Sequence, residues 1–266
     1  MGWNGSKQLS IRDVDLELWD IGSGRPLVFL HAGDGINEVE SFVHSLRMPY
    51  RIVMPSHPGF GGTSLPSTYS TVADLSYFYL DLFDHLQLSD VLLVGASFGA
   101  WIAAEIAIKR PRHLAGIILA DAVGAKFSDR TTREIADPFS TPRHNLEALL
   151  YHDENLRKAN HAERSKEELL RLARNNESFA LYGWAPTLYD PKLKQRLHRI
   201  DVPTHVVWGE HDRVVPVEYG RRFAAEIPGA TFEVIPEVGH YPHREQPAMF
   251  AQAIDRFSSR LGAKDS

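Results

Sequence analysis

Five short, mostly apolar runs recur along the chain and predict buried strands. Each run is four residues long and lies close to Gly, Pro or Asp. Continuous apolar runs of this kind, rather than alternating ones, are typical of strands that are buried on both faces of a parallel sheet. The runs are residues 27–30, 51–54, 91–94, 116–119 and 205–208.

Longer segments between and after these runs carry apolar residues at intervals of three and four. One such segment covers residues 75–86, and the last covers residues 250–261. This spacing predicts helices with one apolar face. Because strands and helices alternate, the sequence predicts an α/β fold, in which a mostly parallel sheet is flanked by helices.

Two regions depart from this alternation. Between residues 9 and 18, apolar and polar positions mostly alternate around a break at Arg12 and Asp13, which predicts an antiparallel hairpin at the N-terminal edge of the sheet. Residues 123–190 have a charged, helical pattern that is rich in aromatic residues. We expect a helical cap (lid) of residues 123–190, inserted in a core of residues 1–122 and 191–266.

Composition narrows the classes of function. The 266 residues include 29 Lys and Arg against 34 Asp and Glu, which gives a net charge of −5, and there is no Cys. A chain without Cys has no disulfides, no thiol nucleophile and no cysteine-ligated metal centre. Because the charge is mildly acidic and has no long runs, nucleic acid is not an expected partner.

The sequence also predicts where the protein works. No apolar run approaches the roughly 18 residues of a membrane span. Residues 1–7 lack the basic and apolar regions of a secretion signal. We therefore expect a cytoplasmic protein without a membrane partner, and the sequence does not indicate its oligomeric state.

Ser97 is the candidate nucleophile. It lies between Gly95 and Gly99, directly after the strand-like run at 91–94 and directly before a helix-like stretch at 100–109. A sharp strand-to-helix turn leaves no room for side chains two residues away from the serine, and it makes the hydroxyl project from the sheet. The N-terminus of the helix also favours the negative charge that develops in acyl transfer.

A serine nucleophile needs a base and an acid that orients the base. His240 is the candidate base, because it follows the strand-like run at 231–235 and precedes the last helix; His243 is the second choice. Asp212, just beyond the strand at 205–208, is the candidate acid. Glu210, two residues earlier, and Asp121, at the end of the strand at 116–119, compete with it.

These motifs resemble the α/β-hydrolase superfamily over nearly the whole chain, in its serine hydrolase, esterase-like branch. The resemblance rests on the serine turn at 95–99, the acid loop at 209–216 and the segment 239–247, with its Glu245 and Pro247. Residues 57–64 are similar to another loop of the superfamily, but Ser56 and His57 stand where Asp is usual. We therefore expect His57 to be structural or to line the cleft.

The resemblance also implies an oxyanion hole with two backbone donors. The N–H of Phe98, immediately after the serine, is one expected donor. The loop at 31–35 supplies the other, Gly33, although Ala32 stands where the superfamily has Gly; His31 is expected to be a buried structural residue. Asp34 either points away from the cleft, where it caps the following helix-like stretch or braces this loop, or it faces the cleft and disfavours substrates that carry a carboxylate.

Hydrolysis of a carboxylic ester of a small organic substrate is the expected function, through an acyl-enzyme and without any cofactor or metal. Tyr182 and Trp184 of the cap are expected to contact the substrate, because their aromatic surface has no sheet face to cover. The same residues could instead cleave a carbon–carbon bond, a lactone or an amide. A slowly acting ligand receptor is the alternative of another class.

Overall fold

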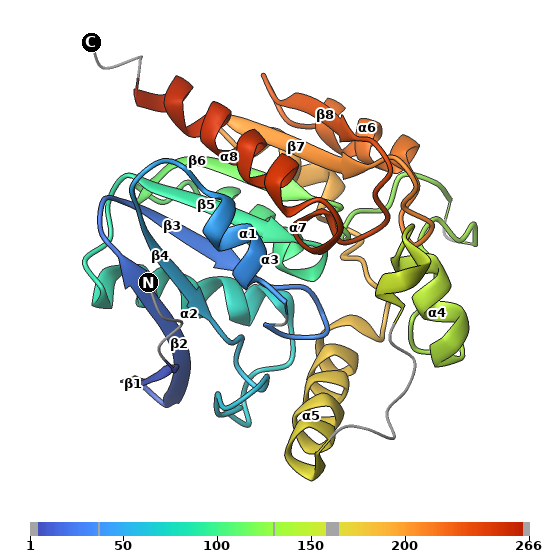
Figure 1. Ribbon diagram of the computed structural model, residues 1–266, viewed down its shortest axis with the longest axis horizontal. Coiled ribbons are helices and arrows are strands. Elements are labelled where there is room, and N and C mark those ends of the chain that lie inside the picture. Colours follow the sequence, from blue (N-terminus) through green and yellow to red (C-terminus); the bar gives the residue numbers. More distant parts are fainter. Residues whose placement is uncertain (1–4, 37, 130, 158–164, 263–266) are drawn as a thin grey trace.

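The computed structural model describes residues 5–36, 38–129, 131–157 and 165–262 of the chain. Its centre is an eight-stranded sheet in the order β1-β2-β4-β3-β5-β6-β7-β8 (Figure 1). The strands β3 to β8 pair in parallel, as the apolar runs predict. The bounds are β1 Lys7–Ile11, β2 Val14–Gly22, β3 Arg25–Leu30, β4 Tyr50–Pro55, β5 Val91–Ala96, β6 Leu114–Ala120, β7 Thr204–Gly209 and β8 Thr231–Ile235.

The N-terminal edge of the sheet is antiparallel. β1 and β2 pair from Lys7 opposite Leu18 to Ile11 opposite Val14, and β2 in turn pairs antiparallel with β4. Arg12, at the turn between the two strands, has a positive φ of 52°. The alternation of apolar and polar residues therefore predicted this edge correctly.

Helices cover both faces of the sheet and enclose two apolar cores. In β3, Val28 and Leu30 belong to one core, whereas Leu27 and Phe29 belong to the other. Successive side chains of a strand point to opposite faces, so a strand that is covered on both faces is apolar throughout. The flanking helices are α2 Val72–His85, α3 Phe98–Ala107 and α6 Val217–Ala225 on the first face, and α1 Glu40–Ser45 and α8 Pro247–Gly262 on the second.

The described part of the chain between β6 and β7 contains one long helix and several short ones. Figure 1 shows α4 and α5 beyond the ends of the strands, to one side of the sheet. α5 begins after Ser165, whose side chain accepts a hydrogen bond from the backbone N–H of Glu168, in a capping box. The elements are α4 Arg143–Leu150, the 3₁₀ helices η1 Glu154–Leu156 and η3 Lys194–Arg199, and α5 Lys166–Gly183.

The position of α4 and α5 agrees with a helical cap over one end of the sheet, and the bounds of that cap remain a prediction.

Within the described ranges, no helix combines the length and the apolar character that are needed to cross a bilayer.

Candidate active site

Ser97 lies in a tight turn between β5 and α3. Its backbone has a φ of 51°, a conformation that L-residues rarely adopt, and its side chain is buried. A Cβ atom on Gly99 would lie 2.1 Å from the carbonyl oxygen of Leu30, and one on Gly95 would lie 2.4 Å from the carbonyl oxygen of Gly99. Both glycines are therefore required by close packing, as the sequence indicated.

The structure brings Ser97, His240 and Asp212 together from three separate loops. His240 Nε2 is 2.7 Å from Ser97 Oγ, and His240 Nδ1 is 2.8 Å from Asp212 Oδ2. The second oxygen of Asp212 accepts hydrogen bonds from the backbone N–H groups of Val214 (2.8 Å) and Val215 (2.9 Å). In this arrangement Nδ1–H donates to the carboxylate, so Nε2 is left to accept the serine proton.

Two of the three residues that competed for these roles lie elsewhere. Glu210 is exposed, and its carboxylate accepts a hydrogen bond from the backbone of Glu237. His243 is buried against the rings of Phe29 and Tyr241, and burial lowers its pKa well below the usual range. Neither contacts Ser97 in the structure, whereas Asp121 is buried close to Asp212 and His240.

Among the described residues, one cluster of side chains has the spacing of a metal site. It consists of Asp121, Asp212 and His240, whose ligand atoms lie within 4.8 Å of one another. However, both ring nitrogens of His240 already form hydrogen bonds, one with Asp212 and one with Ser97. A metal ion at this position would have to break one of these bonds.

His31 and His57 form a buried pair below the loop that carries Gly33. Their rings stack with centroids 3.6 Å apart, and the backbone N–H of His57 donates to His31 Nε2 over 3.0 Å. His57 also bonds to the hydroxyl of Tyr79 and to the carbonyl oxygen of His31. Burial lowers the pKa of His31 to about 4, so the pair is neutral and holds the loop in place.

Gly33, on this loop, and Ser97 line the same cavity. Phe98 is the first residue of α3, so its N–H has no partner inside the helix. Among the described residues, the N–H groups of Gly33 and Phe98 donate no hydrogen bond to a protein acceptor. Both donors that the resemblance implies are thus available for an oxyanion.

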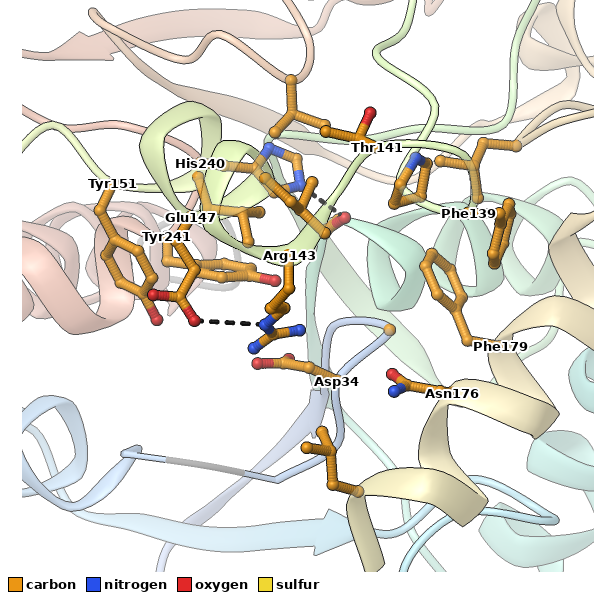
Figure 2. Close-up of a pocket in the computed structure, with 18 of the residues that line it drawn as sticks. Asp34, Phe139, Thr141, Arg143, Glu147, Tyr151, Asn176, Phe179, His240 and Tyr241 are labelled. Atoms are coloured by element: carbon orange, nitrogen blue, oxygen red, sulfur yellow. Dashed lines mark hydrogen bonds and ion pairs between the residues drawn. The ribbon is translucent and has the colours of Figure 1, made fainter. Parts of the chain in front are cut away.

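A cavity of about 740 Å³ opens between Ser97 and the segment that contains α4 and α5. Figure 2 shows Phe139 and Phe179 on one side of this cavity and Glu147, Tyr151 and Tyr241 opposite them. We call Phe139, Phe179 and Trp184 the aromatic wall, because their rings contact one another in series, with centroids 5.1 and 5.5 Å apart. We call Asp34, Arg143, Glu147 and Arg244 the charged wall.

Asp34 lines the cavity and is paired with Arg244. Its two carboxylate oxygens accept hydrogen bonds of 2.8 and 3.0 Å from the Arg244 guanidinium, which also donates to the hydroxyl of Tyr151 and lies 4.1 Å above the ring of Tyr241. Burial alone would raise the pKa of Asp34, but the charge and hydrogen bonds of Arg244 hold it below its usual value. Asp34 therefore faces the cleft and also braces its loop, whereas the N-cap of α1 is Val39.

Of the two cap residues expected to contact substrate, only Trp184 lines the cavity. Tyr182 is buried away from it: its hydroxyl donates to the carbonyl oxygen of Pro58 over 3.2 Å, and its ring stacks on Phe98. The structure therefore does not place Tyr182 at this cavity. Helical spacing explains the difference, because Asn175, Ser178 and Tyr182 share the buried face of α5.

Sequence reasoning missed Arg143, Glu147 and Arg244, and no motif in the chain indicates them. It also assigned no role to Glu245, although the resemblance included that residue. The carboxylate of Glu245 accepts backbone hydrogen bonds from Gly239 (2.7 Å), next to His240, and from His152 and Asp153 (both 2.9 Å) in the inserted segment. Glu245 thus joins the histidine loop to the segment that covers the cavity.

A mostly parallel, helix-flanked sheet with a buried serine at a strand-to-helix turn is the arrangement of an α/β-fold hydrolase. The chain belongs to the alpha/beta hydrolase family, whose sequence model matches residues 27–253.

Two named hydrolases are similar to this chain in sequence over most of their length. The 2-hydroxy-6-oxononadienedioate/2-hydroxy-6-oxononatrienedioate hydrolase 2 of Pseudomonas putida is 28% identical over 268 residues, which cover 91% of each chain. The 2-hydroxymuconate semialdehyde hydrolase of Pseudomonas putida is 26% identical over 263 residues, covering 94% of this chain and 92% of the relative.

Solved structures show the same fold. A thermophilic esterase from Thermogutta terrifontis superimposes with a TM-score of 0.77 at 25% identity, covering 97% of this chain and 99% of the esterase. A meta-cleavage product hydrolase from Pseudomonas fluorescens superimposes with a TM-score of 0.79 at 21% identity, covering 96% of this chain and 97% of the other.

Proposed function

We propose that this hydrolase cleaves carboxylic esters of small organic substrates through an acyl-enzyme on Ser97. The observation that carries the proposal is the continuous series of hydrogen bonds from Ser97 Oγ through His240 to Asp212, at the base of a cavity of about 740 Å³. Such a series activates a hydroxyl that is otherwise a poor nucleophile.

Each residue then has a defined task. Ser97 Oγ attacks the ester carbonyl while His240 Nε2 takes the hydroxyl proton, and the carbonyl oxygen becomes an oxyanion that accepts hydrogen bonds from the N–H groups of Gly33 and Phe98. His240 gives the proton to the departing alkoxide, which leaves as an alcohol. Water attacks the acyl-enzyme in the same way, and the carboxylic acid and free Ser97 result.

Labelling with a fluorophosphonate tests this proposal. We expect one label per chain, located on Ser97 by peptide mass spectrometry, together with turnover of short p-nitrophenyl esters above the background rate. Ser97→Ala is expected to lose the label and to lower kcat by roughly 10⁴- to 10⁶-fold. The matched control is Ser10→Ala, because Ser10 is exposed on β1; a label on another residue would contradict the proposal.

A second function, cleavage of a carbon–carbon bond in a substrate that carries a carboxylate, is supported by Arg143. Figure 2 shows the Arg143 side chain between Glu147 and Asp34, with its Nε bonded to Glu147 Oε1 over 3.2 Å. Among the described residues, its terminal nitrogens have no hydrogen-bond acceptor, so they can bind a carboxylate. The dioate and semialdehyde hydrolases of Pseudomonas putida are named for substrates of this kind.

A pair of matched substrates separates the two functions. For the ester function we expect a neutral ester to have the higher kcat/KM, and Arg143→Met to leave it within about threefold of the original value. For the carbon–carbon function, a carboxylated vinylogous diketone is the better substrate, and Arg143→Met lowers its kcat/KM by roughly 10- to 100-fold, the value of a hydrogen bond to a charged group. Arg133→Met, outside the cavity, is the control.

A further inference from the structure

Asp121 is a buried carboxyl group that the proposed reaction does not use. It follows β6 directly, has a φ of 47° and is completely inaccessible to solvent. Its backbone N–H donates to the carbonyl oxygen of Val207 over 3.0 Å, and its Oδ1 accepts from the N–H of Gly209 over 2.8 Å. These two bonds hold the side chain under the loop that carries Asp212.

The second carboxylate oxygen of Asp121, Oδ2, lies in a site shared with the carboxylate of Asp212. Oδ2 has no hydrogen-bond donor among the described residues, and a carboxylate oxygen of Asp121 lies within 4.8 Å of one of Asp212. Two ionised carboxylates at this separation in a buried site repel each other strongly, so one of them holds a proton.

The number of donors decides which acid is charged. Asp212 accepts hydrogen bonds from His240 Nδ1 and from two backbone N–H groups, whereas Asp121 accepts one, from Gly209. Donors stabilise the ionised form of a carboxyl group. The negative charge is therefore better placed on Asp212, and Asp121 is the acid that keeps its proton.

We propose that Asp121 is a neutral positioning residue whose Oδ2–H donates to Asp212, so that the series Ser97, His240, Asp212 has a fourth member. By donating to Asp212, Asp121 weakens the attraction of that carboxylate for a proton on His240. It thereby lowers the pH at which His240 is free to act as a base. This inference rests on the proposed role of His240.

The surroundings of Asp121 support its neutral form. Burial raises the pKa of Asp121 well above its usual value, the charges of Asp212 and Glu245 act in the same direction, and the Gly209 N–H opposes them. The titratable groups that face it are Asp212 on the loop after β7, His240 on the loop after β8, and Glu245 on α7 (Pro242–Glu245).

Two substitutions at this position separate positioning from simple packing. Asp121→Asn keeps both an acceptor for Gly209 and an N–H donor for Asp212, whereas Asp121→Ala removes both. The matched control is Glu105→Gln, which changes a buried acid of α3 that pairs with Lys109. The readouts are the titration of His240 by NMR with ¹⁵N-labelled histidine, and the rate of fluorophosphonate labelling as a function of pH.

We expect the Asp121→Ala variant to raise the titration midpoint of His240, and the acidic limb of the labelling rate, by roughly one pH unit, as the loss of one charge-assisted hydrogen bond implies. The separate variant Asp121→Asn should keep both midpoints within about 0.3 pH unit of those of the wild-type protein, which is small compared with the shift expected for the Ala variant. An unchanged midpoint in the Ala variant, or an equal shift in the Asn variant, would overturn the proposal.

A spectroscopic measurement tests the proton directly, even if the Ala variant does not fold. The infrared difference spectrum between the original protein and Asp121→Asn at pH 7 should contain the C=O stretch of a protonated carboxyl group. Its absence would overturn the proposal. If wild-type Ser97 is not labelled at all, the proposed function fails, whereas the infrared and NMR measurements still report on Asp121.

Discussion

The charged wall and the aromatic wall of the cavity differ in how their side chains are held. In the charged wall, Asp34 and Arg244 form a bidentate pair with side chains that are only 19% and 4% exposed. In the aromatic wall, Phe139, Phe179 and Trp184 contact one another through their rings, and Trp184 is 58% exposed. One wall is fixed by paired charges, whereas the other is partly open to solvent.

Because the two walls are held differently, we expect one of them to contribute to the stability of the fold and the other to the choice of substrate. Asp34 lies on the loop after β3, next to Gly33, and Arg244 lies on α7, four residues after His240. Their pair therefore links the loop of Gly33 to the helix that follows His240. Trp184 is the C-cap residue that follows α5, and its ring packs against Phe139. Changes in the charged wall should therefore affect the fold, whereas changes at the open end of the aromatic wall should affect which substrates fit.

The largest effect is expected for Arg244→Met, which removes the guanidinium that donates two hydrogen bonds to the carboxylate of Asp34. Removing one member of a buried, hydrogen-bonded ion pair costs about 3–5 kcal/mol of unfolding free energy. Urea unfolding at pH 7 measures this loss. The control is Arg12→Met, because Arg12 pairs with Asp81 at the surface, with side chains 72% and 34% exposed, and such a pair contributes less than about 1 kcal/mol.

The same pair should make stability depend on pH in a defined direction. Arg244 lowers the pKa of Asp34, so the pair stabilises the fold fully above the pKa of an unfolded Asp, about 3.9. This contribution is lost as the pH falls through the lower pKa of the folded state. The stability difference between wild type and Arg244→Met should therefore shrink below about pH 4, and a difference that grows there would contradict this reading.

A smaller effect is expected where the loop of the charged wall touches the aromatic wall. A Cβ atom on Gly33 would lie 2.6 Å from the ring of Phe179, so Gly33→Ala forces the ring to move. Overpacking of this kind costs about 1–3 kcal/mol. Thermal unfolding should show the loss, and the second change Phe179→Leu should recover part of it.

Gly5→Ala provides the control for this pair, because a Cβ atom on Gly5 would have no neighbour within 4 Å. If Gly33→Ala and Phe179→Leu prove additive, the two residues do not compete for space and the prediction is wrong. Labelling of Ser97 in the same variants shows whether movement of the loop also affects the proposed oxyanion hole.

Much of the fold was predictable because its signals are local. The run 27–30 is apolar throughout because successive side chains enter different cores, and that pattern is visible in the sequence alone. Gly95 and Gly99 likewise indicate the turn around Ser97, since close backbone contacts exclude larger residues there. The order of strands along the chain then predicts which loops share one edge of the sheet.

The walls of the cavity were not predictable for a physical reason. Arg143 and Arg244 belong to different elements, and only the three-dimensional arrangement shows that both face one cavity. Tyr182 and Trp184 are two residues apart, so they lie on different sides of α5, and their shared aromatic character was misleading. Tyr182 packs on Phe98, whereas Trp184 reaches the cavity.

The smallest effect on stability, and the clearest on specificity, is expected for Trp184→Ala. Because Trp184 is 58% exposed, its removal should change the free energy of unfolding by less than about 0.5 kcal/mol. Its ring lines the cavity, so the ranking of p-nitrophenyl esters by acyl length should change. Tyr182→Ala is the matched comparison: Tyr182 is 6% exposed, and its loss should cost about 3–5 kcal/mol, as for other large buried aromatic residues, with the ranking unchanged. The opposite pattern, a stable Tyr182→Ala with altered ranking, would show that substrate reaches the buried face of α5.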